Sequence, residues 1–255
     1  NITMKYITGC MLVAFAFSTS LAQAQERKDK GEFIKAENKF YDEIMKNVYL
    51  FNTPPETSKP PVFKMDFSSI EIPKSADEFQ TVWSGKPVSQ GATNTCWSFS
   101  TSSFFESEVR RITGKEVRLS ELYIVYYEYI EKTREYVRTR GGSFFGEGSE
   151  SNAVYRMMKM YGIVPYEDYT GYKVGQKFLD HTVMFKEMEA YLKQVKETSA
   201  WNDKAIESTI RSIMDHYIGK VPESVMVNGK KMTPVEYMNN VLKLNPDDYV
   251  DFMSL

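Results

Sequence analysis

The apolar positions in the middle of the chain recur at the spacing of a helix. Between Cys96 and Thr113 they fall at i, i+4, i+8 and i+11, which places them on one face. These positions are Thr101, Phe105, Val109 and Ile112. Gly114 follows directly, and glycine is common just beyond the end of a helix. The pattern predicts a helix over residues 96–113 with this face buried.

Two further helices follow by the same rules. Ser120 is suited to cap the start of a second helix. The apolar face of that helix comprises Leu122, Val125, Tyr126, Tyr129 and Ile130. A third helix is predicted from about Glu150 to Tyr161, where Gly162 ends it. The tyrosines around Tyr126 fall at helical spacing, so packing between helices explains them better than a ligand platform does.

The last third of the chain is charged and also helical in pattern. Residues 173–245 carry apolar positions at helical spacing, namely Phe185, Met188, Tyr191, Leu192 and Val195. Near the end of this segment, Asn228-Gly229 favours a tight two-residue turn. We therefore expect helices followed by one short hairpin-like turn.

The N-terminal region has a different character. Residues 26–50 are charged and are predicted to form a helix that packs onto a later part of the chain. Its loose apolar stripe comprises Phe33, Phe40, Ile44, Met45 and Val48. Between Phe51 and Lys74, prolines interrupt regular structure at Pro54, Pro55, Pro60, Pro61 and Pro73. This stretch is predicted to be an extended arm.

The first residues have the pattern of a cleavable signal peptide. Lys5 supplies a positive start, an apolar run covers residues 11–17, and Ala22-Gln23-Ala24 is a small-x-small cleavage site. The apolar run is far shorter than the ~20 residues that span a bilayer. We expect cleavage after Ala24, no transmembrane segment, and export to the periplasm or the extracellular space.

Composition narrows the class of protein. Of the 255 residues, 42% are hydrophobic and 14% aromatic, as in folded globular proteins. Lys and Arg total 32 against 34 Asp and Glu, a net charge of −2 that argues against a nucleic-acid binder. No cluster of His, Cys and Asp has the spacing of metal ligands, so neither a metal nor another cofactor is expected.

The number of cysteines bears on the chemistry of the protein. The chain has two cysteines, Cys10 and Cys96, and Cys10 would leave with the signal peptide. A lone thiol in an exported protein is either buried and structural or reactive. Composition alone favours the buried structural residue, since buried free cysteine is common.

The residues around Cys96 favour the reactive alternative. At the first turn of a helix, a thiolate is stabilised by free backbone N–H groups and by the helix dipole. Gln90, six residues earlier, can bring its amide beside the thiol and, with the Cys96 N–H, bind the oxyanion of an attacked carbonyl. Gly91 allows the preceding loop to turn sharply, and Trp97 anchors the start of the helix.

The run Gln90-Gly91, four residues, Cys96-Trp97-Ser98-Phe99 resembles the active-site signature of papain-like cysteine peptidases. Residues 119–127, 147–150 and 161–165, together with Val227-Asn228-Gly229-Lys230, resemble the bleomycin hydrolase/aminopeptidase C branch. The resemblance covers roughly residues 38–255. It implies an α+β papain-like fold, of which this chain supplies mainly the helical domain (76–172) and a helical insertion (173–255), after an N-terminal arm (25–75).

The resemblance also implies roles for individual residues. Cys96 would be the nucleophile and Gln90 the oxyanion-hole donor. The implied substrate-binding residues are Gly148, Ser149 and Trp97; Gly148 and Ser149 stand where the family has a Gly-Gly pair that binds the substrate backbone. Ser149 therefore places the close approach of substrate in question. Thr93 stands where secreted papains have a disulfide cysteine, and Asn94 where they have a glycine.

A thiol peptidase also needs a histidine base oriented by an asparagine. The chain has two histidines, His181 and His216; both lie in the implied insertion beside aspartates and are predicted to be solvated helix residues. The family places its histidine and asparagine in a sheet-rich domain that would follow Leu255. We therefore expect the 255-residue chain to be inactive on its own.

Two functions are consistent with this resemblance. The first is a cysteine peptidase acting on peptides, and the branch implies an aminopeptidase that forms hexamers. The second is a catalytically inactive homologue that binds peptides or proteins. A helical interaction protein with an incidental cysteine does not account for the spacing from Gln90 to Cys96.

Overall fold

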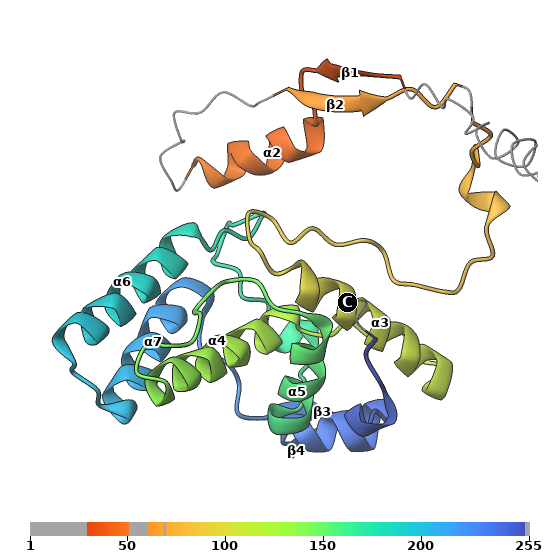
Figure 1. Cartoon of the computed structure of the whole chain (residues 1–255). Helices are drawn as coiled ribbons and strands as arrows, with labels where there is room; N and C mark the ends of the chain where they lie inside the picture. Colours follow the sequence, from red (N-terminus) through yellow and green to blue (C-terminus); the bar gives the residue numbers. More distant parts are fainter. Residues whose placement is uncertain (1–29, 51–60, 69, 253–255) are drawn as a thin grey trace, which may run out of the picture. The chain divides into compact units, whose positions relative to one another are not determined.

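The computed structural model describes residues 30–50, 61–68 and 70–252. The α-helices are α2 (Lys39–Val48), α3 (Cys96–Thr113), α4 (Glu121–Arg138), α5 (Ser151–Tyr161), α6 (Thr182–Thr198), α7 (Asp203–Ile218) and α8 (Pro234–Glu236), which continues into a π-helical turn at Tyr237–Leu242 (Figure 1). The strands are β1 (Gly31–Ile34), β2 (Val62–Met65), β3 (Val225–Val227) and β4 (Lys230–Met232). Single 3-10 turns lie at Ala76–Glu78, Tyr166–Asp168 and Pro246–Asp248.

The chain forms two compact units. Of the described residues, the first comprises 30–37, 61–68 and 70–80, and the second 38–50 and 81–252. In the first unit β1 and β2 pair antiparallel, with Phe33 opposite Phe63 and their rings 5.4 Å apart. Two expectations are corrected here, because residues 31–34 form a strand rather than helix and the arm contains β2. Residues 31–34 form a strand because their backbone pairs with a segment about 30 positions away. The local spacing of apolar residues gives no signal of such pairing.

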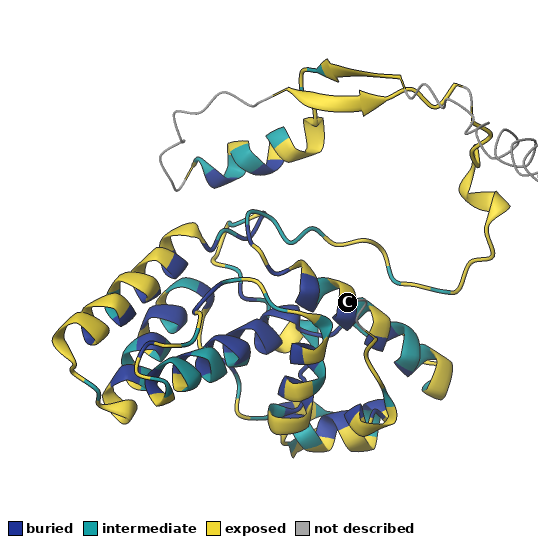
Figure 2. Cartoon of the chain, in the orientation of Figure 1, coloured by how far each residue is buried: buried dark blue, intermediate teal, exposed yellow. Residues whose placement is uncertain are grey.

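The core of the second unit is built around α4. This helix packs against α3, α5 and α7, and Figure 2 shows it buried along most of its length. Tyr126, Tyr129 and Ile130 are at most 1% exposed. All five residues predicted to form the apolar face of this helix are buried. The interpretation of the tyrosines as packing residues is therefore confirmed.

The predicted helix boundaries agree with the structure. Ser120 caps α4 by accepting a hydrogen bond from the Tyr123 N–H at 3.1 Å. Gly114 ends α3 with φ +73°, a backbone angle that favours glycine. On α3, Thr101, Phe105 and Val109 are buried as predicted. Ile112 is 42% exposed, so the apolar face stops one turn before the helix does.

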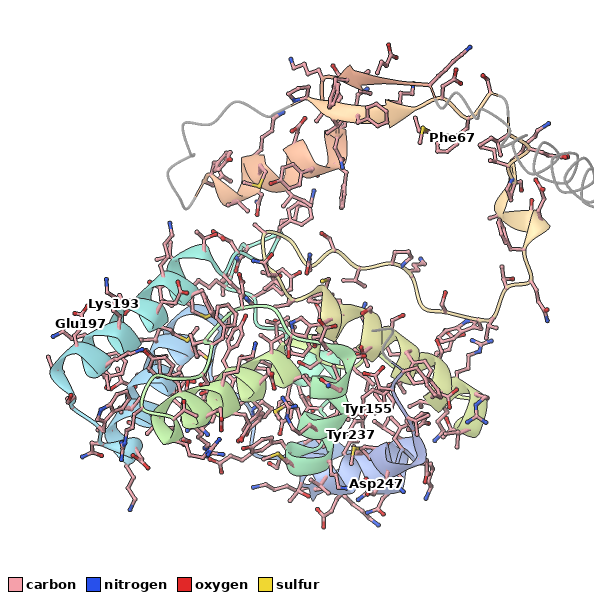
Figure 3. The ribbon with its side chains drawn as sticks, in the orientation of Figure 1. Phe67, Tyr155, Lys193, Glu197, Tyr237 and Asp247 are labelled. Carbon is pink, nitrogen blue, oxygen red and sulfur yellow. The ribbon has the colours of Figure 1, made fainter. Side chains whose placement is uncertain are left out.

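Helices α6 and α7 join the same core. Met188 and Leu192 of α6 and Ile210 of α7 are buried in the cluster that also contains α3, α4 and α5. Lys193 and Glu197 project from the outer side of α6 and pair at 3.8 Å (Figure 3). Residues 81–172 and those after 173 thus share one core, and a boundary at 172 stays a prediction from the family.

The Asn-Gly turn is confirmed. Strands β3 and β4 pair antiparallel, and two residues connect them, with φ +50° at Asn228 and +74° at Gly229. Two positive φ angles in succession are typical of the type I′ turn that Asn-Gly favours.

Helix α2 packs within the second unit, as its stripe predicted. Ile44 and Val48 are buried against Phe178, whose backbone N–H donates to Asn47 Oδ1 at 3.2 Å. Phe40 remains 54% exposed, although its ring contacts that of Phe178. The helix therefore supports the segment that precedes α6.

The targeting segment (1–24) lies outside the described residues, and export stays a prediction. Within the described ranges, none of the helices combines the length and the apolar character that crossing a bilayer requires.

Candidate active site

Cys96 is the first residue of α3, and its thiol is free and exposed. Thr95 precedes it as N-cap and accepts hydrogen bonds from the Ser98 and Phe99 N–H groups through its carbonyl. A thiol at this position faces the positive end of the helix dipole. The exposure contradicts the alternative of a buried structural cysteine.

Gln90 and Cys96 line the same hollow, of about 390 Å³. The other lining residues are Lys86, Pro87, Val88, Phe99, Ser100, Ser103, Glu106 and Glu121. Gln90 Oε1 is buried and makes no hydrogen bond to the described residues. Gln90 thus lines the same hollow as the thiol, and its side-chain oxygen is not committed to a structural contact; the amide N–H is the group that an oxyanion would need.

Residues 90–95, the nucleophile loop, are held by hydrogen bonds of their own. Thr93 Oγ1 donates to the Gln90 carbonyl at 3.0 Å and lies 2.6 Å from Thr95 Oγ1. The Ala92 N–H donates to the Leu179 carbonyl at 2.7 Å. Thr93 and Thr95 are buried, so these hydroxyl contacts fix the path from Gln90 to Cys96. Thr93 therefore stabilises the loop that leads to Cys96.

Gly91 is required by this path, and its substitution gives a first prediction. Its φ is +69°, and an added Cβ would lie 2.2 Å from the Leu179 carbonyl oxygen. We expect Gly91→Ala to lower the free energy of unfolding by about 2 kcal/mol, measured by urea denaturation. Gly114→Ala is the matched control, since Gly114 has a similar φ but open space around it. Equal losses from the two substitutions would contradict a steric requirement at Gly91.

Two of the residues that line the hollow are buried glutamates. Glu106 Oε1 accepts from the Leu119 N–H at 2.9 Å, and Glu121 Oε1 accepts from Arg118 Nη2 at 2.8 Å. Burial raises the pKa of Glu121 to about 7, against the opposing effect of Arg118. Burial also raises the pKa of Glu106. No pattern in the sequence marks Glu106 and Glu121, because a buried glutamate on a helix does not differ in spacing from an exposed one.

Residues 145–149, the substrate loop, carry Gly148 and Ser149. Ser149 Oγ donates to Glu128 Oε1 at 2.9 Å, and Arg156 Nη2 donates to Glu128 Oε2 at 2.7 Å. Lys132 Nζ donates to the carbonyls of residues 146 and 148. The Ser149 side chain therefore points toward α4. This geometry reduces the concern that serine in place of glycine obstructs a substrate at this loop.

A second prediction concerns this contact. We expect Ser149→Ala to lower the free energy of unfolding by about 1 kcal/mol, because the Glu128 carboxylate loses a donor while it keeps Arg156. Ser208→Ala, an exposed serine of α7, is the control and should be neutral or slightly stabilising. Urea denaturation measures both. No loss in the Ser149 variant would show that the hydroxyl is dispensable for loop stability.

The predicted environment of one histidine is wrong. His181 is fully buried just before α6, with Nδ1 3.5 Å from Glu147 Oε1. Its backbone contacts Ala92 and its ring lies near Tyr129, so long-range packing shields it despite the neighbouring aspartate. His216 is exposed on α7, as predicted. Neither histidine is among the residues that line the hollow at Cys96.

Trp97 is 5% exposed and belongs to the core. The residue therefore anchors the start of α3, and the substrate contact that the resemblance implied for it stays a prediction. In the part of the chain that the structure describes, no group of three or more His, Cys, Asp or Glu side chains could hold a metal ion.

Comparison with known proteins adds one result at the level of the family. The model of the papain family of cysteine proteases matches residues 72–249, more than half of the chain. Among solved structures, the chain is similar to PepW from Lactobacillus rhamnosis HN001, with a TM-score of 0.48 and 14% identity. That similarity covers 62% of this chain and 44% of PepW, so the chain spans less than half of that protein. No curated protein matches the sequence.

Proposed function

Since the chain belongs to the papain family of cysteine proteases, we propose that Cys96 is the nucleophile in the hydrolysis of peptide bonds. The observation that carries this proposal is the hollow shared by Gln90 and Cys96 at the start of α3. The papain-like α+β fold, here represented mainly by helices, supplies the helix end that such a thiol needs.

In the proposed reaction the Cys96 sulfur attacks the carbonyl carbon of the scissile bond. A C–S bond forms, and the electron pair of the carbonyl moves to its oxygen. The side-chain amide of Gln90 and the Cys96 N–H then bind the oxyanion. Collapse of this intermediate breaks the C–N bond, and the leaving amine takes up the proton that the Cys96 thiol gave up. Water hydrolyses the resulting thioester and regenerates the thiol.

The departure of the amine requires a proton donor near Cys96, a role that a histidine has in thiol peptidases, and neither histidine of this chain lines the hollow. His181 is buried beside Glu147, and His216 lies exposed on α7. We therefore propose that the chain alone binds peptides and forms adducts with them but turns over amide substrates slowly. The same observation favours the second candidate function, an inactive homologue that binds peptides.

A peptide aldehyde separates these possibilities, because a thiol adds to it without expelling an amine. Addition forms a C–S bond and places the thiol proton on the aldehyde oxygen. We expect a short peptide aldehyde to protect Cys96 from iodoacetamide in a saturable way, measured by mass spectrometry. Cys96→Ala should abolish aldehyde binding in calorimetry. Absence of protection at millimolar aldehyde would reject the nucleophile assignment.

The proposal that the enzyme is an aminopeptidase rests on the resemblance to the bleomycin hydrolase branch. It is tested with two aldehydes of the same sequence, one with a free N-terminal amine and one acetylated. Preference for the free amine supports an aminopeptidase, and equal affinity opposes it. A fluorogenic aminoacyl amide tests turnover, and rapid hydrolysis by the chain alone would reject the proposal that it lacks a histidine acid beside Cys96.

A further inference from the structure

Two loops that are distant in sequence meet beside Cys96. Asn94 of the nucleophile loop donates from Nδ2 to Glu147 Oε2 of the substrate loop at 2.8 Å. Asn94 lies two residues before the thiol, and Glu147 directly precedes Gly148. One hydrogen bond to a carboxylate thus connects the two parts of the candidate site.

The second oxygen of Glu147 faces His181. The Nδ1–Oε1 distance is 3.5 Å, a close approach in which neither atom makes a hydrogen bond to the described residues, and the imidazole is fully buried. The segment that carries His181 also holds the nucleophile loop, since the Ala92 N–H donates to the Leu179 carbonyl and the His181 N–H donates to the Ala92 carbonyl at 3.4 Å. The contacts therefore close a ring from residue 92 through 181 and 147 to 94.

The surroundings favour a charged Glu147. Burial raises the pKa of its carboxyl, but His181 and Asn94 outweigh burial and lower the pKa below its usual value. From α4, Lys132 adds a positive charge nearby, and the Tyr129 hydroxyl lies 3.5 Å from the Glu147 carbonyl oxygen. The side chain of Glu147 is 14% exposed, so water screens these interactions only in part.

We propose that Glu147 is a positioning residue for the thiol chemistry: its carboxylate, backed by His181, fixes Asn94 and thereby sets the nucleophile loop against the substrate loop. This inference rests on the proposed function. A peptide that binds along the substrate loop must present its carbonyl to Cys96, and small displacements between such groups are costly. The link is a hydrogen bond and not a covalent bond.

The experiment uses the full chain with Cys10→Ser throughout, so that Cys96 is the sole thiol. The variants are Asn94→Ala, Glu147→Ala, their combination, and Glu147→Gln, which keeps an oxygen for Asn94. We expect each alanine variant to weaken the peptide aldehyde about tenfold and the double variant to be no weaker than the weaker single variant. Glu147→Gln should recover most of the affinity.

Two controls separate positioning from general stability. Alkylation of Cys96 by iodoacetamide needs no aligned peptide, so its rate should change less than about twofold in every variant. Glu197→Ala, an exposed carboxylate on α6, should leave the aldehyde affinity unchanged. If the alanine variants only lower the melting temperature and bind the aldehyde as the parent does, the positioning role is rejected. Additive losses in the double variant reject it also.

Hydrogen exchange tests the link without any ligand. Changing residue 147 should speed exchange at the amides of residues 91–95, and changing Asn94 should speed it at residues 146–148, each about tenfold. If the parent protein binds no aldehyde, but each substitution still speeds hydrogen exchange in the other loop, the peptidase proposal is rejected. The hydrogen bond then exists but has no role in catalysis. A parent that binds the aldehyde but shows uncoupled exchange rejects the link alone.

Discussion

Gln90→Ala is expected to weaken the binding of a peptide aldehyde about tenfold while iodoacetamide alkylates Cys96 at an unchanged rate. The oxygen of the aldehyde adduct carries the thiol proton and accepts a hydrogen bond from the Gln90 amide; loss of one hydrogen bond to a neutral oxygen costs about 1 kcal/mol, less than loss of a donor to a developing oxyanion. Alkylation develops no oxyanion. Because Gln90 Oε1 makes no hydrogen bond to the described residues, the substitution removes little structure.

The two measurements together identify the role of Gln90. Gln194→Ala, an exposed glutamine of α6, is the matched control and should change neither value. Parallel losses in aldehyde affinity and alkylation rate would indicate that Gln90 shapes the loop and not the oxyanion hole. Unchanged aldehyde affinity would show that Gln90 does not act on the bound carbonyl.

Glu121 is expected to make the folded protein less stable as the pH rises from about 4.5 to 7. In the folded state the carboxyl keeps its proton up to about pH 7, because burial raises its pKa, whereas in the unfolded chain it ionises near pH 4.5. Between these values the folded state binds more protons, so raising the pH favours unfolding. The full effect is about 3 kcal/mol. The positive charge of Arg118, which pairs with Glu121, favours the ionised carboxylate and so limits the rise in the Glu121 pKa.

The measurement is the free energy of unfolding of the parent and of Glu121→Gln, obtained by urea denaturation at several pH values. The difference between the two proteins is then followed as the pH changes. Glutamine does not titrate, so the parent should lose stability relative to the variant across this window. Glu106 belongs to the same buried group and titrates in both proteins. The free energy of unfolding of the parent is therefore compared with that of the variant and is not interpreted alone. Glu167→Gln, at an exposed position, should show no such trend. A constant difference between parent and Glu121→Gln would contradict the prediction.

The elements predicted best are those whose signals are local. Ser120 caps α4 and Gly114 ends α3 because side-chain and backbone chemistry at single positions decides a helix end. The turn at Asn228-Gly229 follows from the same kind of signal. The motif from Gln90 to Cys96 is also local, and the structure places both residues on one hollow.

The features that sequence analysis missed depend on contacts between distant segments. Strand β1 forms because residues 31–34 pair with β2. Four residues are too few to show a periodicity that would predict this pairing. His181 has an aspartate beside it and was expected in solvent, yet packing against Ala92, Tyr129 and Glu147 buries it completely. The link from Asn94 to Glu147 spans 53 positions and could not be inferred from either loop alone.

The inward turn of the Ser149 hydroxyl has a consequence for selectivity. With this side chain bonded to Glu128 and Gly148 having none, the loop offers a bound peptide mainly its main chain at these two positions. Main-chain hydrogen bonds are the same for every amino acid, so this part of the site would sense the direction and register of a peptide and would be tolerant of its sequence. If the proposed function holds, discrimination between substrates has to arise elsewhere along the bound chain.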